Sequence, residues 1–131
     1  MSIQWGRILL AAFLMELILF AIAIPLMLSG ATRTELYSLP PAAFIATFAV
    51  TVWLGRGIKS RPVLHGVLIG VAGTLMYVGL SLAAPEPWQY VLGNALKVVG
   101  GAVGGMVLAR RRPAQTGWAS KAVYSKEPTT E

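Results

Sequence analysis

Four long apolar runs, separated by short polar segments, account for most of the chain. They cover residues 8–28, 39–55, 63–84 and 88–109. At about 1.5 Å per residue the first run is about 31 Å long, enough to cross a hydrocarbon layer of about 30 Å. The second run is near the lower length limit for a crossing, and its neighbours favour a membrane. We therefore predict an all-α protein, an integral membrane four-helix bundle with up-down topology and short loops.

The polar segments between these runs carry signals that end one helix and begin the next. Ser29 to Ser38 is the predicted first connection, with Ser38 as the N-cap of a helix that has Pro40 and Pro41 in its first turn. The segment Pro85-Glu86-Pro87 interrupts the chain before the last run, because each proline disfavours helix at the preceding residue. These signals predict four separate helices.

A secretory signal peptide is an alternative interpretation of the first run. Arg7 precedes this run and Ser29-Gly30-Ala31 follows it, as at a cleavage site. However, the apolar region of a signal peptide is only about 7–15 residues long. Glu16, near the centre of the run, is also foreign to such a region. A retained membrane helix is therefore favoured.

The composition supports the membrane prediction. The chain is 56% hydrophobic and 12% charged, whereas soluble domains are about 25% charged. The net charge of +6 would suit a nucleic-acid partner, but the basic residues flank apolar runs instead of forming one stripe. We therefore expect the lipid bilayer as partner and no nucleic acid. The chain has no cysteine, which excludes disulfides, zinc–thiolate sites and thiol catalysis.

The basic residues also predict an orientation. The N-terminal arm, the connection after residue 55 and the segment 110–131 hold nine of the eleven Lys and Arg residues. Because positive charge gathers on the cytoplasmic side, both termini are predicted to be cytoplasmic, in a multi-pass protein of the plasma (bacterial inner) membrane. Residues 110–131 are polar without an apolar period, and we predict a disordered cytoplasmic tail.

Two ionisable residues lie inside predicted spans. Glu16 lies about 13 Å and Lys97 about 20 Å from the cytoplasmic side, at about 1.5 Å of rise per residue. An isolated charge at the bilayer centre costs about 2.5–3.5 kcal/mol, so we expect the two side chains to pair. This predicts that the first and fourth helices pack together with Glu16 facing Lys97. Asn94, one turn before Lys97, is expected to share its hydrogen bonding.

Small residues recur at helical spacing in the last two runs. At 100° per residue, Tyr90, Asn94, Lys97, Gly101, Gly105 and Leu108 share one face. Glycines four residues apart allow two helix backbones to approach closely. The predicted helix-packing glycines are Gly66, Gly70, Gly73, Gly100, Gly101, Gly104 and Gly105.

Two classes of function are compatible with these features. The first is a non-enzymatic structural or accessory membrane subunit, in a homo-oligomer or a larger membrane complex, with the Glu16–Lys97 pair as an assembly device. The second is a small proton- or anion-coupled transporter or channel with Glu16, Asn94 and Lys97 lining a midplane site, where Lys97 attracts an anionic substrate. No nucleophile–base pair or metal-ligand set can be assembled, so we expect no enzyme, no catalytic residue, no metal and no cofactor.

The segment Ala11-Ala12-Phe13-Leu14-Met15-Glu16 places a lone glutamate in the first span. In this feature, in length and in span number, the chain resembles the small multidrug resistance transporters. The resemblance implies an antiparallel homodimer in which the glutamates bind protons and cationic drugs alternately. Lys97 departs from that pattern because it would repel cations. A dual-topology dimer also needs nearly equal numbers of Lys and Arg in the loops on its two sides, whereas here they are concentrated on one side. We therefore do not assign the chain to that family.

Overall fold

The computed structural model describes residues 3–58, 60–82 and 85–111. The described residues form helices α1 (Trp5–Leu28), α2 (Thr32–Leu54), η1 (Gly55–Gly57, a 3-10 turn), α3 (Pro62–Leu80) and α4 (Trp88–Arg111). All regular structure in these ranges is helical, which confirms the all-α prediction. The four α-helices are each long and apolar enough to cross a membrane, with mean hydropathies from 1.5 to 2.6. Of the predicted tail, residues 110 and 111 belong to α4, and the rest lies outside the described residues.

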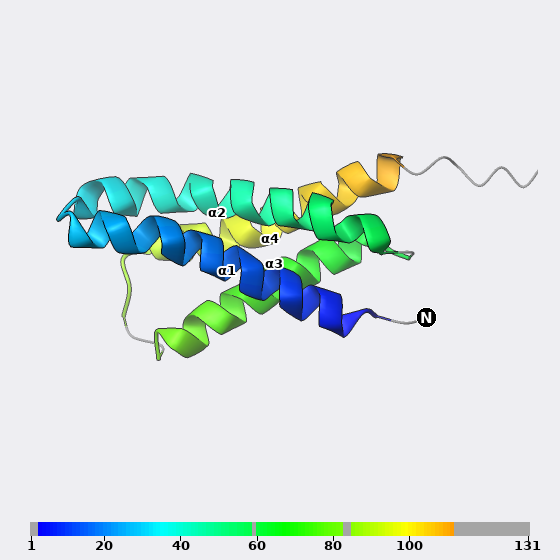
Figure 1. The fold of residues 1–131 in the computed structure, drawn as a ribbon, viewed down its shortest axis with the longest axis horizontal. Helices are drawn as coiled ribbons and strands as arrows, with labels where there is room; N and C mark the ends of the chain where they lie inside the picture. The colour runs from blue at the N-terminus through cyan, green and yellow to red at the C-terminus, as the bar shows by residue number, and fades with distance from the viewer. Residues whose placement is uncertain (1–2, 59, 83–84, 112–131) are drawn as a thin grey trace, which may run out of the picture.

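The four α-helices lie side by side along the long axis of the molecule (Figure 1). The turn between α1 and α2 lies at one end, together with the last turn of α3 and the first turn of α4 (Figure 1). We call this the hairpin end. The N-terminus, the turn between α2 and α3 and the last turn of α4 lie at the opposite end, which we call the terminal end (Figure 1).

The helices occupy the corners of a four-membered bundle. Helix α4 packs against α2 and α3, and α1 packs against the same two helices. Helices α1 and α4 are therefore diagonal, and none of their described Cα atoms lie within 8 Å of one another. The prediction that the first and fourth helices pack directly is wrong, because α2 and α3 already cover the glycine-lined faces of α4.

Helix α2 begins earlier than its apolar run predicts. It starts at Thr32 after Ala31, so Ser38 lies within the helix and does not cap it, and Pro40 and Pro41 are internal. The polar first turn is stable because Glu35 faces the bundle, where its side chain is buried and accepts a hydrogen bond from α4. A tertiary contact therefore extends the helix through a polar segment.

The third helix is shorter than its predicted span. It begins at Pro62, whose missing N–H suits the first turn of a helix. It ends at Leu80, and the Ser81 N–H bonds to the Tyr77 carbonyl as a C-cap. Leu82 then adopts a positive φ of 52°, which turns the chain out of the helix. The predicted end at residue 84 lies outside the described residues.

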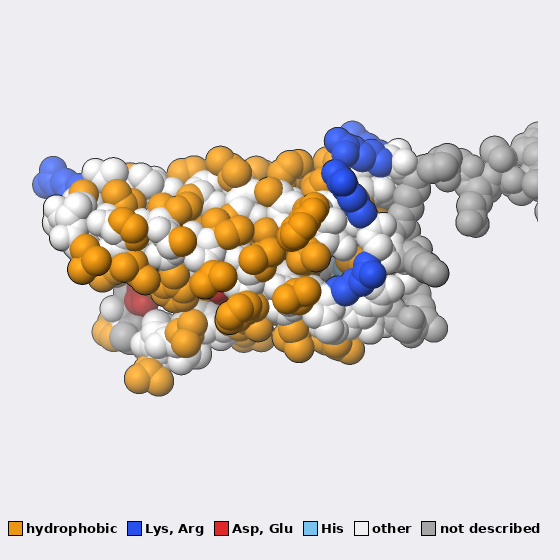
Figure 2. Space-filling model, viewed as in Figure 1, with side chains coloured by type: hydrophobic (Ala, Val, Ile, Leu, Met, Phe, Trp, Pro, Cys, Tyr) orange, Lys and Arg blue, Asp and Glu red, His pale blue; other side chains and the backbone are white. Residues whose placement is uncertain are grey.

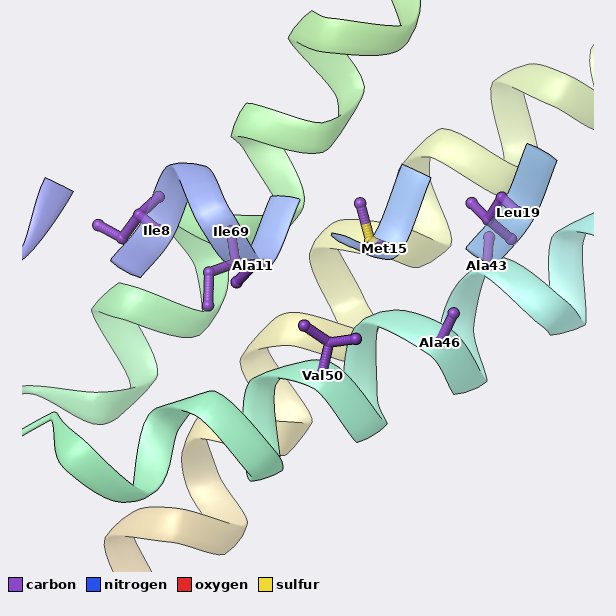
Figure 3. Packing of buried hydrophobic residues seen from close by; sticks show 8 residues of the cluster. All are labelled: Ile8, Ala11, Met15, Leu19, Ala43, Ala46, Val50 and Ile69. Carbon is purple, nitrogen blue, oxygen red and sulfur yellow. The ribbon is translucent and has the colours of Figure 1, made fainter. Parts of the chain in front are cut away.

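The apolar core lies mainly between α1 and α2. Ile8, Ala11, Met15 and Leu19 recur every three or four residues and form one stripe along α1. This stripe meets a stripe of small and branched side chains on α2, with Ile69 of α3 beside it (Figure 3). The α2 stripe consists of Ala43, Ala46 and Val50. These short side chains let the two helices approach closely.

Glycines bring α4 into backbone contact with its neighbours. A Cβ on Gly66 of α3 would strike the Gly101 carbonyl of α4, and a Cβ on Gly101 would strike the Gly66 carbonyl. A Cβ on Gly70 would lie 2.6 Å from the Lys97 carbonyl oxygen. On the α2 side, a Cβ on Gly100 would lie 2.6 Å from the Phe44 carbonyl oxygen. The remaining predicted glycines face Met15 (Gly73), Thr51 and Phe48 (Gly104), and Pro62 (Gly105).

Candidate ligand-binding pocket

A buried ion pair crosses the centre of the bundle. Lys97 Nζ lies 2.5 Å from Glu16 Oε1, and the two side chains are 4% and 5% exposed. The pair joins the diagonal helices α1 and α4 through their side chains, without contact between their backbones. Each charge alone would be costly at this degree of burial, and together they neutralise one another.

Helix α3 makes room for this pair. Gly73 lies beside Met15 and Glu16, where even a methyl group would press on both side chains. One turn further along α3, the Tyr77 ring lies under the Lys97 ammonium, with Nζ 4.9 Å from the ring centroid. This cation–π contact adds a second favourable partner for Lys97. Glycine and tyrosine on the same face of α3 thus set the position of the Lys97 head group.

Two further carboxylates lie on the hairpin side of this pair, and tyrosines hold both. The Tyr77 hydroxyl donates to the Glu86 carboxylate, and the Tyr90 hydroxyl donates to Glu35 Oε1 at 2.9 Å. The two tyrosine rings stack with centroids 6.1 Å apart and an interplanar angle of 8°. Glu35 from α2 and Glu86 from the segment before α4 are therefore fixed around one aromatic pair.

These side chains line a pocket of about 540 Å³ at the hairpin end. All four helices contribute to it, and its charged lining consists of three carboxylates and one ammonium group: Glu16, Glu35, Glu86 and Lys97. Its remaining walls are mainly apolar, for example Leu19, Phe20, Leu39 and Leu80. In Figure 2, acidic side chains appear in a recess of the orange surface toward the hairpin end. The pocket thus combines an apolar wall with an excess of acidic groups.

Asn94 lies in this pocket, but its predicted contact with Lys97 is not formed. Its side chain is half-buried and lines the cavity. Its backbone carbonyl accepts a hydrogen bond from Thr74 Oγ1 at 3.3 Å. Among the described residues no hydrogen bond joins the Asn94 side chain to Lys97, whose ammonium bonds to Glu16 instead.

The side chain of Gln89, at the edge of the pocket, has one buried atom without a hydrogen-bond partner among the described residues. Gln89, in the first turn of α4, is 9% exposed and lines the cavity. Its Oε1 has no hydrogen-bond donor among the described residues. This oxygen has almost no accessible surface, so it lies within the packed wall and does not face the cavity.

Sequence reasoning found the pair and missed most of the pocket. Tyr90 was predicted only as a member of a helix face and Glu86 only as part of a connection, and Tyr77 and Glu35 were not singled out. One signal was present in the predicted topology, because it places Glu35 and Glu86 in the two connections on the same side of the bundle. Acidic residues in both of those connections indicate a shared acidic surface.

The described residues contain no group of three or more His, Cys, Asp or Glu side chains placed to hold a metal ion. His65, the single histidine, lies toward the terminal end and is 2% exposed. Its Nδ1 lies 3.0 Å from the Arg61 carbonyl, and its Nε2 accepts from the Gln4 N–H at 3.4 Å. It is thus held by backbone groups away from the pocket.

Comparisons with known protein families, with curated proteins and with solved structures find no match to this chain.

Proposed function

We propose that the four α-helices cross the plasma (bacterial inner) membrane in an up-down order with both termini in the cytoplasm. Large apolar side chains on the outside of the bundle support this, since lipid is the solvent that suits them. Examples are Leu10 and Phe13 of α1, Ile45 of α2 and Leu75 of α3, each more than half exposed. The basic side chains gather mainly at the terminal end (Figure 2), which would then face the cytoplasm.

Within this membrane protein, we propose a non-enzymatic role in binding a small solute, as a transporter or as an accessory subunit of a transport complex. The pocket at the hairpin end is the observation that carries this proposal. It is large enough for a small molecule, it is mostly apolar, and a few fixed polar groups converge in it. In the proposed orientation it lies in the non-cytoplasmic half of the bundle.

The Glu16–Lys97 pair favours a second, structural role alongside binding. The two groups bond directly and are almost fully buried, as expected of a device that fixes which helices meet and in what register. A closed pair is a poor coupling site for protons. We propose that it forms the floor of the pocket, and that solute contacts the groups above it.

The orientation can be tested with introduced cysteines, because the chain has none of its own. Thr34 at the hairpin end and Ser60 at the terminal end are both exposed. In right-side-out inner-membrane vesicles, an impermeant thiol reagent should label Thr34→Cys at once. It should label Ser60→Cys only after the vesicles are permeabilised. The reverse order would contradict the orientation, and equal labelling of both sites would contradict a single topology.

The pocket can be tested in the same vesicles. Asn94→Cys lies in the cavity, whereas Ala46→Cys lies in the α1–α2 core and serves as the buried control. A small, impermeant, cationic methanethiosulfonate should react with Asn94→Cys much faster than with Ala46→Cys. Equal and negligible rates would mean that solute does not reach the cavity, and the binding role would be rejected.

A further inference from the structure

We infer that the terminal end of the bundle binds the phosphate group of an anionic phospholipid through Arg7, Arg56 and Arg61, which we call the arginine cluster. The inference uses the proposed membrane insertion, and it is independent of the pocket at the hairpin end. It depends on three features of the terminal end: the contacts that bring these arginines together, the absence of a balancing carboxylate, and the apolar surface beside them.

Gly57 provides a seat for the Arg7 side chain. A Cβ on this glycine would overlap the Arg7 guanidinium group, so the side chain from α1 reaches across to the turn η1. Gly57 does not have a positive φ, so its backbone would accept an alanine without strain. The absence of a side chain here therefore makes room for Arg7. Arg56 directly precedes Gly57 in the same turn and is exposed, so two arginines lie at this junction.

A second contact brings Arg61 to the same junction. The Gln4 N–H, just before α1, donates a hydrogen bond to His65 Nε2 at 3.4 Å. On the other side of the ring, His65 Nδ1 lies 3.0 Å from the carbonyl oxygen of Arg61. Arg61 is exposed and directly precedes α3. The start of α1 is thus held at two points of the connection between α2 and α3, and this fixes the backbones that carry the cluster.

The charge of the arginine cluster is not balanced by a carboxylate in the described part of the chain. The acidic residues there are Glu16, Glu35 and Glu86, and all three line the pocket toward the hairpin end. The ion pair found there joins Glu16 to Lys97 at the centre of the bundle. A guanidinium group has five N–H donors in a planar fork that matches the oxygens of a phosphate. The cluster therefore fits a phosphate group.

Apolar surface beside the cluster favours a lipid headgroup as the source of this phosphate. Leu10, one turn after Arg7 on α1, is 56% exposed, and Trp53, in the last turn of α2, is 61% exposed. Figure 2 shows basic side chains at the terminal end directly beside the hydrophobic surface of the bundle. In the proposed membrane this border lies at the headgroups, where tryptophan is common and basic side chains attract anionic lipids. A soluble phosphate or a nucleic acid would leave the apolar surface in water.

The site can be tested on the full chain in phosphatidylcholine vesicles, with Trp53 as the reporter. In a variant whose other tryptophans are replaced by phenylalanine, a brominated lipid quenches Trp53 fluorescence only when it lies close by. A small fraction of brominated phosphatidylglycerol should quench Trp53 more than the same fraction of brominated phosphatidylcholine. A matching variant that keeps only Trp88, exposed at the hairpin end, should show much less preference.

The two reporters give results that would reject the inference. Equal quenching of Trp53 by the two brominated lipids, or an equal preference at Trp88, would overturn it. Quenching of Trp53 by neither lipid would reject membrane insertion, and the lipid site would fail with it. A preference confined to Trp53 supports the site, whatever thiol labelling shows for the pocket.

Two glycine variants separate a built site from diffuse attraction between charges. A basic residue near an anionic membrane surface contributes about 1 kcal/mol, so Arg7→Gln should lower the preference for phosphatidylglycerol about fivefold. Gly57→Ala keeps every charge but displaces the Arg7 guanidinium group, and it should lower the preference by a similar factor. Gly6→Ala, next to Arg7, places a Cβ that meets nothing within 4 Å and should leave the preference unchanged. An unchanged preference in Gly57→Ala would mean that net charge alone attracts the lipid, and the site would be rejected.

Inorganic phosphate distinguishes a lipid site from a site for a soluble anion. When chloride is exchanged for inorganic phosphate at matched ionic strength, the preference at Trp53 should not change, because the lipid is also held by its chains. Loss of the preference would show that the cluster binds free phosphate, and the lipid assignment would be overturned. Arg7, Arg56 and Gly57 are exposed, so their variants should keep the helix content of the parent in circular dichroism. Arg56→Gln should lower the preference as Arg7→Gln does, and an unchanged preference would remove Arg56 from the site.

Discussion

Removing one member of the Glu16–Lys97 pair should destabilise the bundle far more than removing both. The ion pair is short, 2.5 Å between Nζ and Oε1, and both side chains are at least 95% buried. Lys97→Met leaves the Glu16 carboxylate without its partner, and Glu16→Leu leaves the ammonium of Lys97. Each orphan charge costs about 2.5–3.5 kcal/mol near the bilayer centre. The double variant has apolar side chains of similar size at both positions and should recover most of this loss.

The assay is a double-mutant cycle on the full chain in detergent, with helix content followed by circular dichroism during unfolding. Because each single variant loses about 2.5–3.5 kcal/mol and the double variant little, we expect a coupling free energy of about 5–7 kcal/mol, reduced by whatever the double variant loses. A control cycle pairs Lys97→Met with Glu35→Gln, whose carboxylate bonds to Tyr90 instead of Lys97. Those two changes should add within about 0.5 kcal/mol. A coupling below about 1 kcal/mol for Glu16 and Lys97 would refute the conclusion that this pair holds the bundle together.

Two further predictions concern packing and the tyrosine–carboxylate contacts. Gly70→Ala places a Cβ 2.6 Å from a carbonyl oxygen of α4. The control is Gly79→Ala, whose Cβ meets nothing within 4 Å. Relative to this control, Gly70→Ala should lower the free energy of unfolding by about 1–3 kcal/mol. Thermal unfolding of the two variants checks this, and equal melting temperatures would contradict the close α3–α4 contact. Tyr90→Phe removes the donor to buried Glu35 and should cost about 1–3 kcal/mol, whereas exposed Tyr37→Phe should cost almost nothing. Similar stabilities of these two variants would show that the Glu35 contact adds little.

The helices were largely predictable because apolar length and proline position are local properties of the sequence. The prediction failed at the start of α2, where residues 32–38 look like a polar loop. Glu35 changes that outcome, since its contact with Tyr90 exists only after α2 and α4 have met. A polar first turn held by a distant partner leaves no local signal.

The charge pair was predictable from depth alone, but the helices beside it were not. Rise per residue places Glu16 and Lys97 at similar levels, and the cost of isolated charges then requires them to meet. The same argument does not say which backbones touch. That depends on which neighbour fits each glycine: Gly66 and Gly70 lie against α4 from α3, and Gly100 lies against α2. Small residues predict that two helix backbones approach closely, but they do not identify which helix is the neighbour.

The uneven distribution of glycine along α4 explains why the bundle is tight at one end and hollow at the other. Gly100, Gly101, Gly104 and Gly105 all lie on the terminal side of Lys97, where backbones of α2 and α3 fill the space around α4. On the hairpin side of Lys97, α4 itself has a single glycine, Gly93, and a Cβ there would be in ordinary contact with Pro40 at 3.7 Å.

Lys97 therefore sits at the boundary between a closed and an open half of the bundle. Its bond to Glu16 spans the diagonal between α4 and α1. In the proposed membrane the pair would close the bottom of the cavity, and the glycine contacts beneath it would keep the cytoplasmic half sealed. A solute that moves past this level must first separate Glu16 from Lys97. Structural pairing and control of passage would then be two consequences of the same contact.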